Sequence, residues 1–278
     1  MKFHCKALPS LFAATFLFSL NLHKISAERR IQSIANASTK TNPYIPPRTL
    51  IDGIVEELSL SSGDYEFADV YGCCSAAEAA TCFESDQSCS DYNDVNLSPS
   101  KIGSMPQFTK DQSLHVLEIA KKAWNNGAGT WPQMSIKDRI NAIENFVEEL
   151  KKSREEIVIA LMWEIGKNRK DAEAEFDRTM QFIKQSIESI RSSDNADFDS
   201  DFRSIGSTRA FARRAAIGII MCLGPYNYPL NETYATLIPA LLMGNVVIMK
   251  VPTIGGLAHL LTSKFFRSKL TSKILSTG

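Results

Sequence analysis

The stretch Ala216-Ile-Gly-Ile-Ile-Met-Cys-Leu223 is a continuous apolar run of strand length, which predicts a strand buried on both faces of a sheet. It is broken by Gly224-Pro-Tyr-Asn-Tyr-Pro229, and a mostly apolar helix is expected over residues 231–243. Val246-Val-Ile-Met-Lys250 is a second strand, and another helix follows it. The order strand, helix, strand predicts a parallel βαβ crossover, and therefore an α/β fold.

Two polar segments follow the ends of these strands. In parallel sheets, ligands bind beyond the carboxyl ends of the strands, and parallel pairing would bring both segments to one edge. We therefore expect Asn227 and Lys250 on the same rim of the sheet. The predicted site is built from Pro225, Tyr226, Asn227, Lys250 and Thr253.

Four amphipathic helices are expected before the crossover, and their short links predict that they pack as one layer. Thr109, Ser135 and Ser153 are the expected N-caps of the first three, and Gly166 ends the third. The expected apolar faces are, in chain order, Leu114, Leu117 and Trp124; Ile136, Ile140, Ile143, Val147 and Leu150; and, on a helix from about Lys170 to Arg191, Phe176, Met180, Ile183, Ile187 and Ile190.

Composition indicates an ordinary globular chain. Its 278 residues are 44% hydrophobic and 22% charged, which predicts one or two domains. Lys and Arg number 31, as do Asp and Glu, and the resulting zero net charge removes the bulk electrostatic argument for nucleic-acid binding. No apolar run reaches the ~18–20 residues that a transmembrane helix needs, so no membrane span is expected.

The N-terminus reads as a targeting signal. A basic start, the apolar stretch Ala7–Leu22 and a small residue at Ala27 predict a signal peptide over residues 1–27. An amphipathic first helix is the alternative, and Pro9 argues against it. Residues 28–48 resemble a transit or linker segment. We expect entry into the secretory pathway, towards secretion or a plastid, and a cytoplasmic protein if the segment is not a signal.

Residues 49–108 form an acidic, Cys-containing segment, whose first part, 49–100, has eleven carboxylates and no Lys or Arg. The spacing of Cys73, Cys74, Cys82 and Cys89 lacks paired C-x-x-C units, so no metal site is expected. The surrounding carboxylates disfavour a reactive thiolate. A secreted acidic binding protein built around this segment is one functional alternative. Residues 109–278 form the remaining domain.

The crossover resembles the aldehyde dehydrogenase superfamily, through Gly224–Pro229 and Pro239-Ala-Leu-Leu-Met-Gly-Asn-Val-Val-Ile-Met-Lys250. Upstream, Trp131-Pro132, Arg139 and Glu164-Ile-Gly-Lys167 are similar to its N-terminal helices. Glu175-Phe-Asp-Arg-Thr179 and the Asn227-Tyr228 pair most resemble the NADP-dependent, non-phosphorylating glyceraldehyde-3-phosphate dehydrogenases. The resemblance covers roughly residues 98 to 262. It implies that residues 109–278 are a partial aldehyde dehydrogenase cofactor-binding domain, with a helical layer followed by the first βαβ part of a Rossmann-like fold, truncated.

The resemblance also implies a chemistry. In this family a Cys thiolate attacks the aldehyde, hydride passes to the nicotinamide, and a Glu activates water that hydrolyses the thioester. Asn227 would donate to the oxyanion, and Arg178 and Tyr228 would contact a phosphorylated substrate. The structural alternatives are a turn Asn, a packed Tyr228, and an Arg178 paired with Glu175 on its own helix.

The implied cofactor-binding residues are Leu223, Pro225, Tyr226, Lys250 and Thr253. Lys250 could reach a ribose hydroxyl and a 2′-phosphate. Many NAD-using members carry a Glu where this chain has Thr253, and an uncharged residue there does not repel a 2′-phosphate. NADP is therefore expected over NAD. Alternatively, Thr253 caps the helix that follows.

The expected reaction is oxidation of a small-molecule aldehyde, glyceraldehyde 3-phosphate to 3-phosphoglycerate. The nucleophilic Cys and the general base lie in the family's second half, whereas this chain ends at Gly278, so we expect it to be inactive alone. Cys222 reads as a small buried hydrophobic residue. The alternatives are another aldehyde or semialdehyde dehydrogenase, and a non-catalytic remnant that binds NADP or a subunit. A complete member would form a homo-oligomer.

Overall fold

The computed structural model of the chain describes residues 14–16, 44–52, 54–61, 63–72, 100–194, 202–211 and 215–270. The strands of its main sheet are β1 (Ala14–Phe16), β2 (Arg48–Ile51), β3 (Ile54–Glu57), β8 (Ile219–Leu223) and β9 (Val246–Lys250), in the order β3-β2-β1-β9-β8. Two hairpins pair separately: β4 (Glu66–Tyr71) with β5 (Lys101–Gln107), and β6 (Phe202–Ile205) with β7 (Thr208–Phe211).

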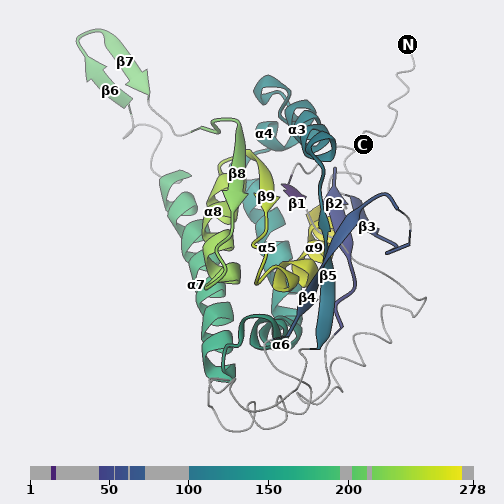
Figure 1. The fold of residues 1–278 in the computed structure, drawn as a ribbon. Helices are drawn as coiled ribbons and strands as arrows, with labels where there is room; N and C mark the ends of the chain where they lie inside the picture. The colour runs from purple at the N-terminus through teal and green to yellow at the C-terminus, as the bar shows by residue number, and fades with distance from the viewer. Residues whose placement is uncertain are drawn as a thin grey trace.

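The predicted crossover is confirmed. β8 and β9 pair in parallel, from Ile219 opposite Val246 to Leu223 opposite Lys250. Helix α8 (Pro229–Leu242) connects them and lies alongside both strands (Figure 1). The fold is therefore α/β, as the apolar runs predict.

Helices cover both faces of the sheet at β9. Val247 and Met249 on one face belong to the main core, together with side chains of α5 (Ile136–Lys152), α6 (Arg154–Ile165), α7 (Arg169–Asp194), α8 and α9 (Leu257–Leu270). Val246 and Ile248 on the other face pack against α3 (Lys110–Trp124). Because alternate side chains of a strand point to opposite faces, β9 reads as a continuous apolar run.

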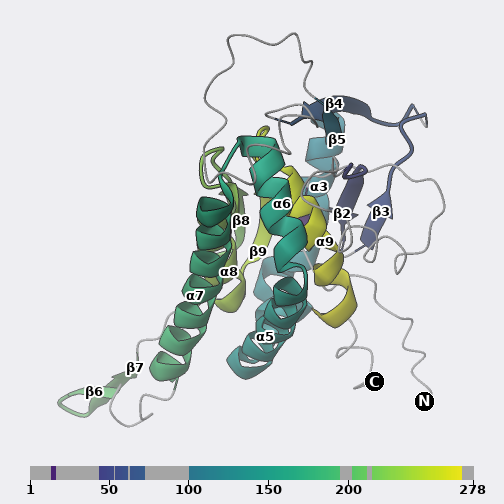
Figure 2. The same cartoon turned by 90° about the horizontal axis from the view of Figure 1, so that it is seen from below.

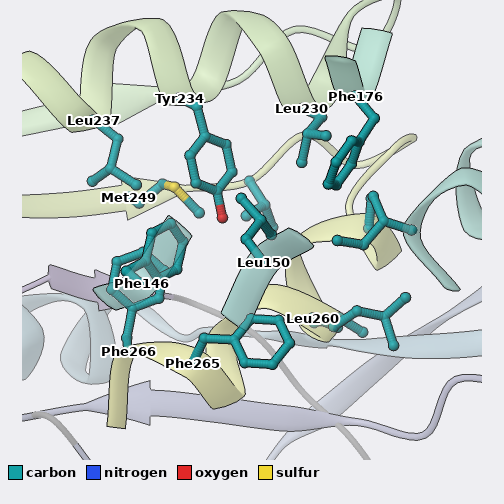
Figure 3. Packing of buried hydrophobic residues seen from close by; sticks show 14 of the residues in the cluster. Phe146, Leu150, Phe176, Leu230, Tyr234, Leu237, Met249, Leu260, Phe265 and Phe266 are labelled. Carbon is teal, nitrogen blue, oxygen red and sulfur yellow. The ribbon is translucent and has the colours of Figure 1, made fainter. Parts of the chain in front are cut away.

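The main core is rich in aromatic side chains. The rings of Phe146 and Phe266 lie 4.3 Å apart, and Tyr234 stacks on Phe146 at 6.0 Å (Figure 3). Helix α7 packs against both α6 and α8 (Figure 2). The expected apolar faces of α5 and α7 are confirmed, since Ile140, Ile143, Leu150, Phe176, Ile183 and Ile187 are buried and Ile136, Val147, Met180 and Ile190 are partly buried against the core.

The prediction that all four helices pack as one layer is wrong for α3. This helix packs on the opposite face of the sheet from α5, α6 and α7. Its buried residues are Val116, Ala120 and Ala123, whereas Leu114 is 48% exposed. Small side chains on that face let the helix approach the strands closely. The expected cap at Thr109 is confirmed as a capping box with Gln112, and the helix ends in the left-handed conformation at Asn125, before the short helices η1 (Asn125–Gly127) and α4 (Thr130–Gln133).

Two local expectations differ from the structure. Ser153 precedes α6 but its side chain makes no capping hydrogen bond, because the same residue ends α5 and its backbone (φ −101°, ψ 18°) is not in the extended conformation of an N-cap. Strand β8 is not buried on both faces, since Met221 and Leu223 are each 60% exposed. The reason is position: β8 is an edge strand, and α3 covers mainly its neighbour β9.

Strands β2 to β5 occupy the acidic segment and were not expected from its composition. Ala14–Phe16, inside the expected signal peptide, pair in parallel with β9. Cys5, Cys73, Cys74, Cys82 and Cys89 and the linker 28–43 lie outside the described residues. Within the described ranges, no helix is long and apolar enough to cross a bilayer.

Candidate functional site

Two loops meet where β8 and β9 end. The amide of Gly224 donates to the carbonyl of Lys250 at 3.3 Å, directly after Leu223 and Lys250 pair across the strands. A Cβ at Gly255 would lie 2.6 Å from Cβ of Pro229, so the second loop is packed against the start of α8. The expectation that Asn227 and Lys250 share one rim is confirmed, while the roles of these residues remain predictions.

The first loop presents polar and aromatic side chains to solvent. Tyr226 is 68% and Tyr228 is 41% exposed, Asn227 is also exposed, and Pro225 is partly buried. The Asn227 amide has no hydrogen-bond partner among the described residues, so it is not used to close the turn. A side-chain amide left free at the carboxyl edge of a sheet can donate to a ligand oxygen.

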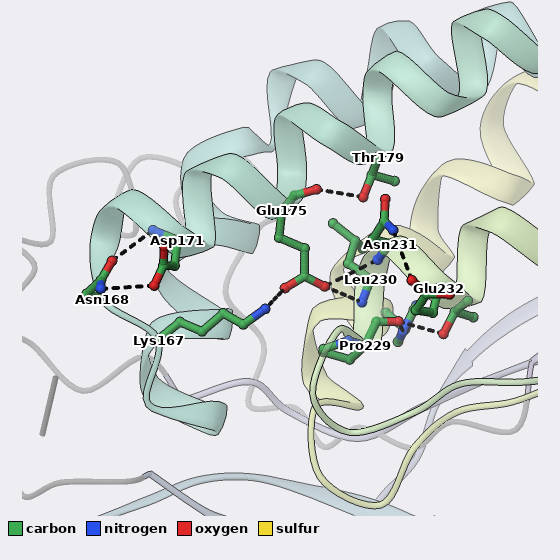
Figure 4. A network of polar contacts seen from close by, with 11 residues as sticks. Lys167, Asn168, Asp171, Glu175, Thr179, Pro229, Leu230, Asn231 and Glu232 are labelled. Atoms are coloured by element: carbon green, nitrogen blue, oxygen red, sulfur yellow. Dashed lines mark hydrogen bonds and ion pairs between the residues drawn. The ribbon is translucent and has the colours of Figure 1, made fainter. Parts of the chain in front are cut away.

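The first turn of α8 is capped from another helix. Glu175 on α7 is buried, and its Oε1 accepts the amides of Leu230 at 3.0 Å and Asn231 at 3.2 Å (Figure 4). Its Oε2 forms an ion pair with Lys167. The carboxylate thus compensates two free N–H groups and the positive end of the helix dipole.

Tyr228 lies between two cations. The Lys167 ammonium is 4.0 Å from the centroid of the Tyr228 ring, and the Arg178 guanidinium carbon is 6.0 Å from it. Arg178 is exposed and has no ion-pair partner in the described part of the chain, and Glu175 pairs with Lys167 instead. The alternative of a solvated Arg178–Glu175 pair is therefore wrong, because the Glu175 side chain turns inward to α8.

The second loop carries Lys250 and Thr253, both exposed. Helix α9 begins at Leu257, so Thr253 is too far upstream to cap it. The cap is Glu164 at the end of α6, whose carboxylate accepts the amides of Gly255, Gly256 and Leu257 at 2.8–2.9 Å. Burial raises the pKa of Glu164 to about 7, against the opposing effect of these three amides.

The far end of α8 is held by residues that the resemblance had singled out. Trp131 Nε1 donates to the carbonyl of Leu241 at 3.1 Å, and Arg139 Nε donates to that of Leu242 at 2.8 Å. Asn245 Nδ2 donates to the carbonyl of Ala240. These contacts satisfy the last carbonyls of the helix, so these motif residues stabilise the crossover rather than contact a ligand.

Cys222 is inert, as expected. It is fully buried, its Sγ lies 3.4 Å from the carbonyl oxygen of Thr233, and burial raises its pKa to about 11. A buried thiol is a poor nucleophile because the thiolate is the reactive species. No cluster of three or more His, Cys, Asp or Glu side chains in the described part could hold a metal ion.

Reasoning from the sequence did not assign roles to Glu164, Lys167 and Glu175. One signal was available: Glu164 is a carboxylate within the apolar run Ile157–Ile165, and a buried carboxylate must find donors. Which donors it finds could not be read, because they lie 91 to 93 residues away.

Comparison with known proteins agrees with this architecture. The Aldehyde dehydrogenase family matches residues 83–275, a longer stretch than the expected 98 to 262. An NADP-dependent glyceraldehyde-3-phosphate dehydrogenase of Streptococcus equinus is 29% identical over 168 residues, which is 60% of this chain and 34% of that protein. An N-succinylglutamate 5-semialdehyde dehydrogenase of Chromohalobacter salexigens is 30% identical over 138 residues, 49% of this chain and 26% of that protein.

Solved structures share the fold. The glyceraldehyde-3-phosphate dehydrogenase of Methanocaldococcus jannaschii, complexed with NADP, matches with TM-score 0.53 and 23% identity, covering 63% of this chain and 36% of that one. A NAD-dependent benzaldehyde dehydrogenase of Corynebacterium glutamicum matches with TM-score 0.55 and 21% identity, covering 84% and 42%. The chain spans about a quarter to a third of the length of the two curated relatives named above. With more than half of its residues matched, the chain belongs to the aldehyde dehydrogenase family.

Proposed function

We propose that this chain supplies the cofactor side and part of the substrate side of an NADP-dependent aldehyde dehydrogenase that oxidises glyceraldehyde 3-phosphate to 3-phosphoglycerate. The observation that carries the proposal is the meeting of the Asn227 loop and the Lys250 loop at one edge of a parallel sheet. The relative of Streptococcus equinus, named for this activity, supports the choice.

The residues at this edge fit NADP. The first-turn amides of α9 already donate to Glu164, so they are closed to a phosphate group. Lys250 is an exposed ammonium at the same edge and would bind the ribose or its 2′-phosphate, beside an uncharged Thr253. Leu223 offers an exposed apolar surface on the strand that precedes the loop. When bound, NADP supplies a hydride acceptor.

The substrate side favours a phosphorylated aldehyde. Arg178 is exposed and lies beside Tyr228, and a guanidinium presents a planar fork of donors that suits a phosphate dianion. Asn227 lies three residues before Leu230, the first residue whose amide Glu175 accepts. Its side-chain amide would donate to the oxygen that becomes negative as the carbonyl is attacked. A preorganised donor of this kind contributes about 3–4 kcal/mol in comparable sites.

The nucleophile is not among the described residues, where Cys222 is the one free cysteine and is buried. We therefore expect the purified 278-residue chain to bind NADP but not to turn over. NADPH formation from glyceraldehyde 3-phosphate, followed by absorbance, would refute this expectation.

Calorimetric titration of the full chain with NADP and NAD tests the cofactor. Lys250→Met should weaken NADP binding, and Thr253→Glu should weaken NADP by about tenfold while sparing NAD, because a carboxylate repels the 2′-phosphate. Lys170→Met, an exposed lysine on α7, is the matched control. Equal NADP affinity in Lys250→Met and the control would contradict the assignment.

The semialdehyde dehydrogenases are the second candidate, because one relative of that class is 30% identical over 49% of the chain. Titration with 3-phosphoglycerate and with glycerate separates the two. If phosphate is recognised, Arg178→Ala weakens only the binding of 3-phosphoglycerate. Equal loss for both ligands would favour a substrate without phosphate.

A further inference from the structure

Lys167 and Glu175 form a charge pair to which the proposed chemistry gives no role. The Glu175 side chain is fully buried and that of Lys167 is 15% exposed. Burying two charges is unfavourable unless their geometry is good and further hydrogen bonds satisfy them. The structure supplies those bonds on the carboxylate side, through the amides of Leu230 and Asn231.

These amides begin the helix that follows the candidate oxyanion donor. Tyr228 is the N-cap residue of α8, yet its side chain makes no capping hydrogen bond, and Pro229 has no N–H to offer. The cap is instead delivered by Glu175 from a helix 55 residues earlier in the chain. The place where the Asn227–Tyr228 segment enters α8 is therefore set by α7.

The ammonium of the pair also contacts the segment directly. It lies 4.0 Å from the centroid of the Tyr228 ring, within the range of a cation–π interaction. Tyr228 is 41% exposed, and the other cation near its ring, Arg178, is farther away at 6.0 Å. Lys167 thus links the buried carboxylate to the exposed aromatic side chain.

We propose that Lys167 and Glu175 are positioning residues, which fix Tyr228 and the neighbouring Asn227 for the substrate. The consequence for substrate binding rests on the function proposed above, whereas the placement of the segment does not. If the pair served only stability, breaking it would lower the free energy of unfolding. It would not selectively change the environment of Tyr228 or the affinity for the phosphorylated ligand.

Three variants of the full chain separate these roles. Lys167→Met keeps the aliphatic stem and removes the charge. Glu175→Gln keeps an acceptor for the two α8 amides and removes the ion pair. Lys167→Arg should rescue, because a guanidinium both pairs with a carboxylate and stacks on an aromatic ring. Lys170→Met, three residues along and exposed, is the control.

Three measurements report on the segment. Carbon-13 NMR of labelled tyrosine, with the Tyr228 signal assigned by its loss in Tyr228→Phe, reports the environment of the ring. Hydrogen exchange compares the amides of Leu230 and Asn231 with that of Leu237 in the middle of α8. Calorimetry with 3-phosphoglycerate and with NADP reports binding.

We expect the carbon-13 chemical shift of Tyr228 to change in Lys167→Met and in Glu175→Gln. In Lys167→Arg it should stay close to that of the unmodified chain. Lys167→Met should raise exchange at Leu230 and Asn231 by about tenfold relative to Leu237. Affinity for 3-phosphoglycerate should fall at least about fivefold, with NADP affinity changed less than about twofold.

An unchanged Tyr228 signal in both Lys167→Met and Glu175→Gln would overturn the proposal. So would a loss of 3-phosphoglycerate and NADP affinity in equal measure. If the unmodified chain binds no 3-phosphoglycerate, the proposed function fails, and the tyrosine signal and amide exchange still decide whether the pair positions the segment. If Lys167→Met does not fold, Glu175→Gln and Lys167→Arg decide by the same signals.

Discussion

Two buried groups at the base of the site should respond to pH in opposite directions. Glu164 and His259 are both buried near the start of α9: Glu164 accepts its first amides, and His259 lies in its first turn. Burial raises the pKa of Glu164 from 4.5 to about 7, and burial lowers the pKa of His259 from 6.5 to about 4. His259 Nε2 is 2.9 Å from the carbonyl oxygen of Pro229, so the neutral ring with its proton on Nε2 fits this contact.

The direction in which each group changes stability with pH follows from the difference between its folded and unfolded pKa. Between pH 4.5 and 7 the folded protein keeps the Glu164 proton that the unfolded chain loses, so stability falls as pH rises, by about 3 kcal/mol in total. Between pH 6.5 and 4 the unfolded chain protonates His259 while the folded protein does not, so stability falls as pH falls, by about 3 kcal/mol. Where the windows overlap, the two slopes cancel.

Substitution of one group should therefore expose the slope of the other. Urea unfolding followed by circular dichroism at pH 4.5, 5.5, 6.5 and 7.5 is the assay. We expect the free energy of unfolding to rise with pH in Glu164→Gln and to fall with pH in His259→Gln, with a difference of about 3 kcal/mol between the ends of the series in each. Gln at 259 can still donate to the Pro229 carbonyl. Glu188→Gln, on the exposed side of α7, is the control.

A flat profile in His259→Gln would refute the reasoning for Glu164. It would mean that the three amides at the start of α9 keep the carboxylate ionised throughout, and that hydrogen bonding outweighs burial. A flat profile in Glu164→Gln would refute it for His259.

Other substitutions test the supports of the crossover. Arg139→Met should destabilise the fold by about 2–3 kcal/mol, because the carbonyl of Leu242 loses a charged donor in a buried place; Arg139→Lys should restore little, and the thermal midpoint measures both. Asn245→Ala should lower the free energy of unfolding by about 2–4 kcal/mol, because the amides of Ile217 and Gly218 lose their acceptor. Asn245→Asp keeps an acceptor for both amides and should lower it less; urea unfolding measures both variants. Cys222 should resist alkylation in the native chain at pH 8 and react in urea, as peptide mass spectrometry would record; rapid native labelling would contradict its burial.

The sequence predicted the elements whose evidence is local. The βαβ unit follows from two apolar runs and the break at Gly224–Pro229, and the structure places the strands within three residues of the expected ends. The capping box at Thr109 and the helix end at Asn125 follow from residues that contact one another within a turn. Adjacency of Asn227 and Lys250 follows from parallel pairing alone.

Properties that depend on neighbours were not predictable. An apolar run in the sequence does not show whether its strand lies at the edge or in the middle of a sheet. It therefore could not predict that Met221 and Leu223 are exposed on an edge strand. On α3 the expected Leu117 and Trp124 pack against the cluster that faces the sheet, whereas Leu114 is exposed. Val116, Ala120 and Ala123, which were not expected there, are the buried residues.

By itself, the sequence determined the crossover, the rim on which its loops meet, and the buried, unreactive state of Cys222. Only the tertiary structure decided that Glu175 caps α8, that Glu164 caps α9, and that Lys167 lies against Tyr228. The physical reason is the range of the interactions. Periodicity and capping motifs record contacts within a few residues, whereas a buried carboxylate takes its donors from whichever helix packs beside it, here tens of residues away along the chain.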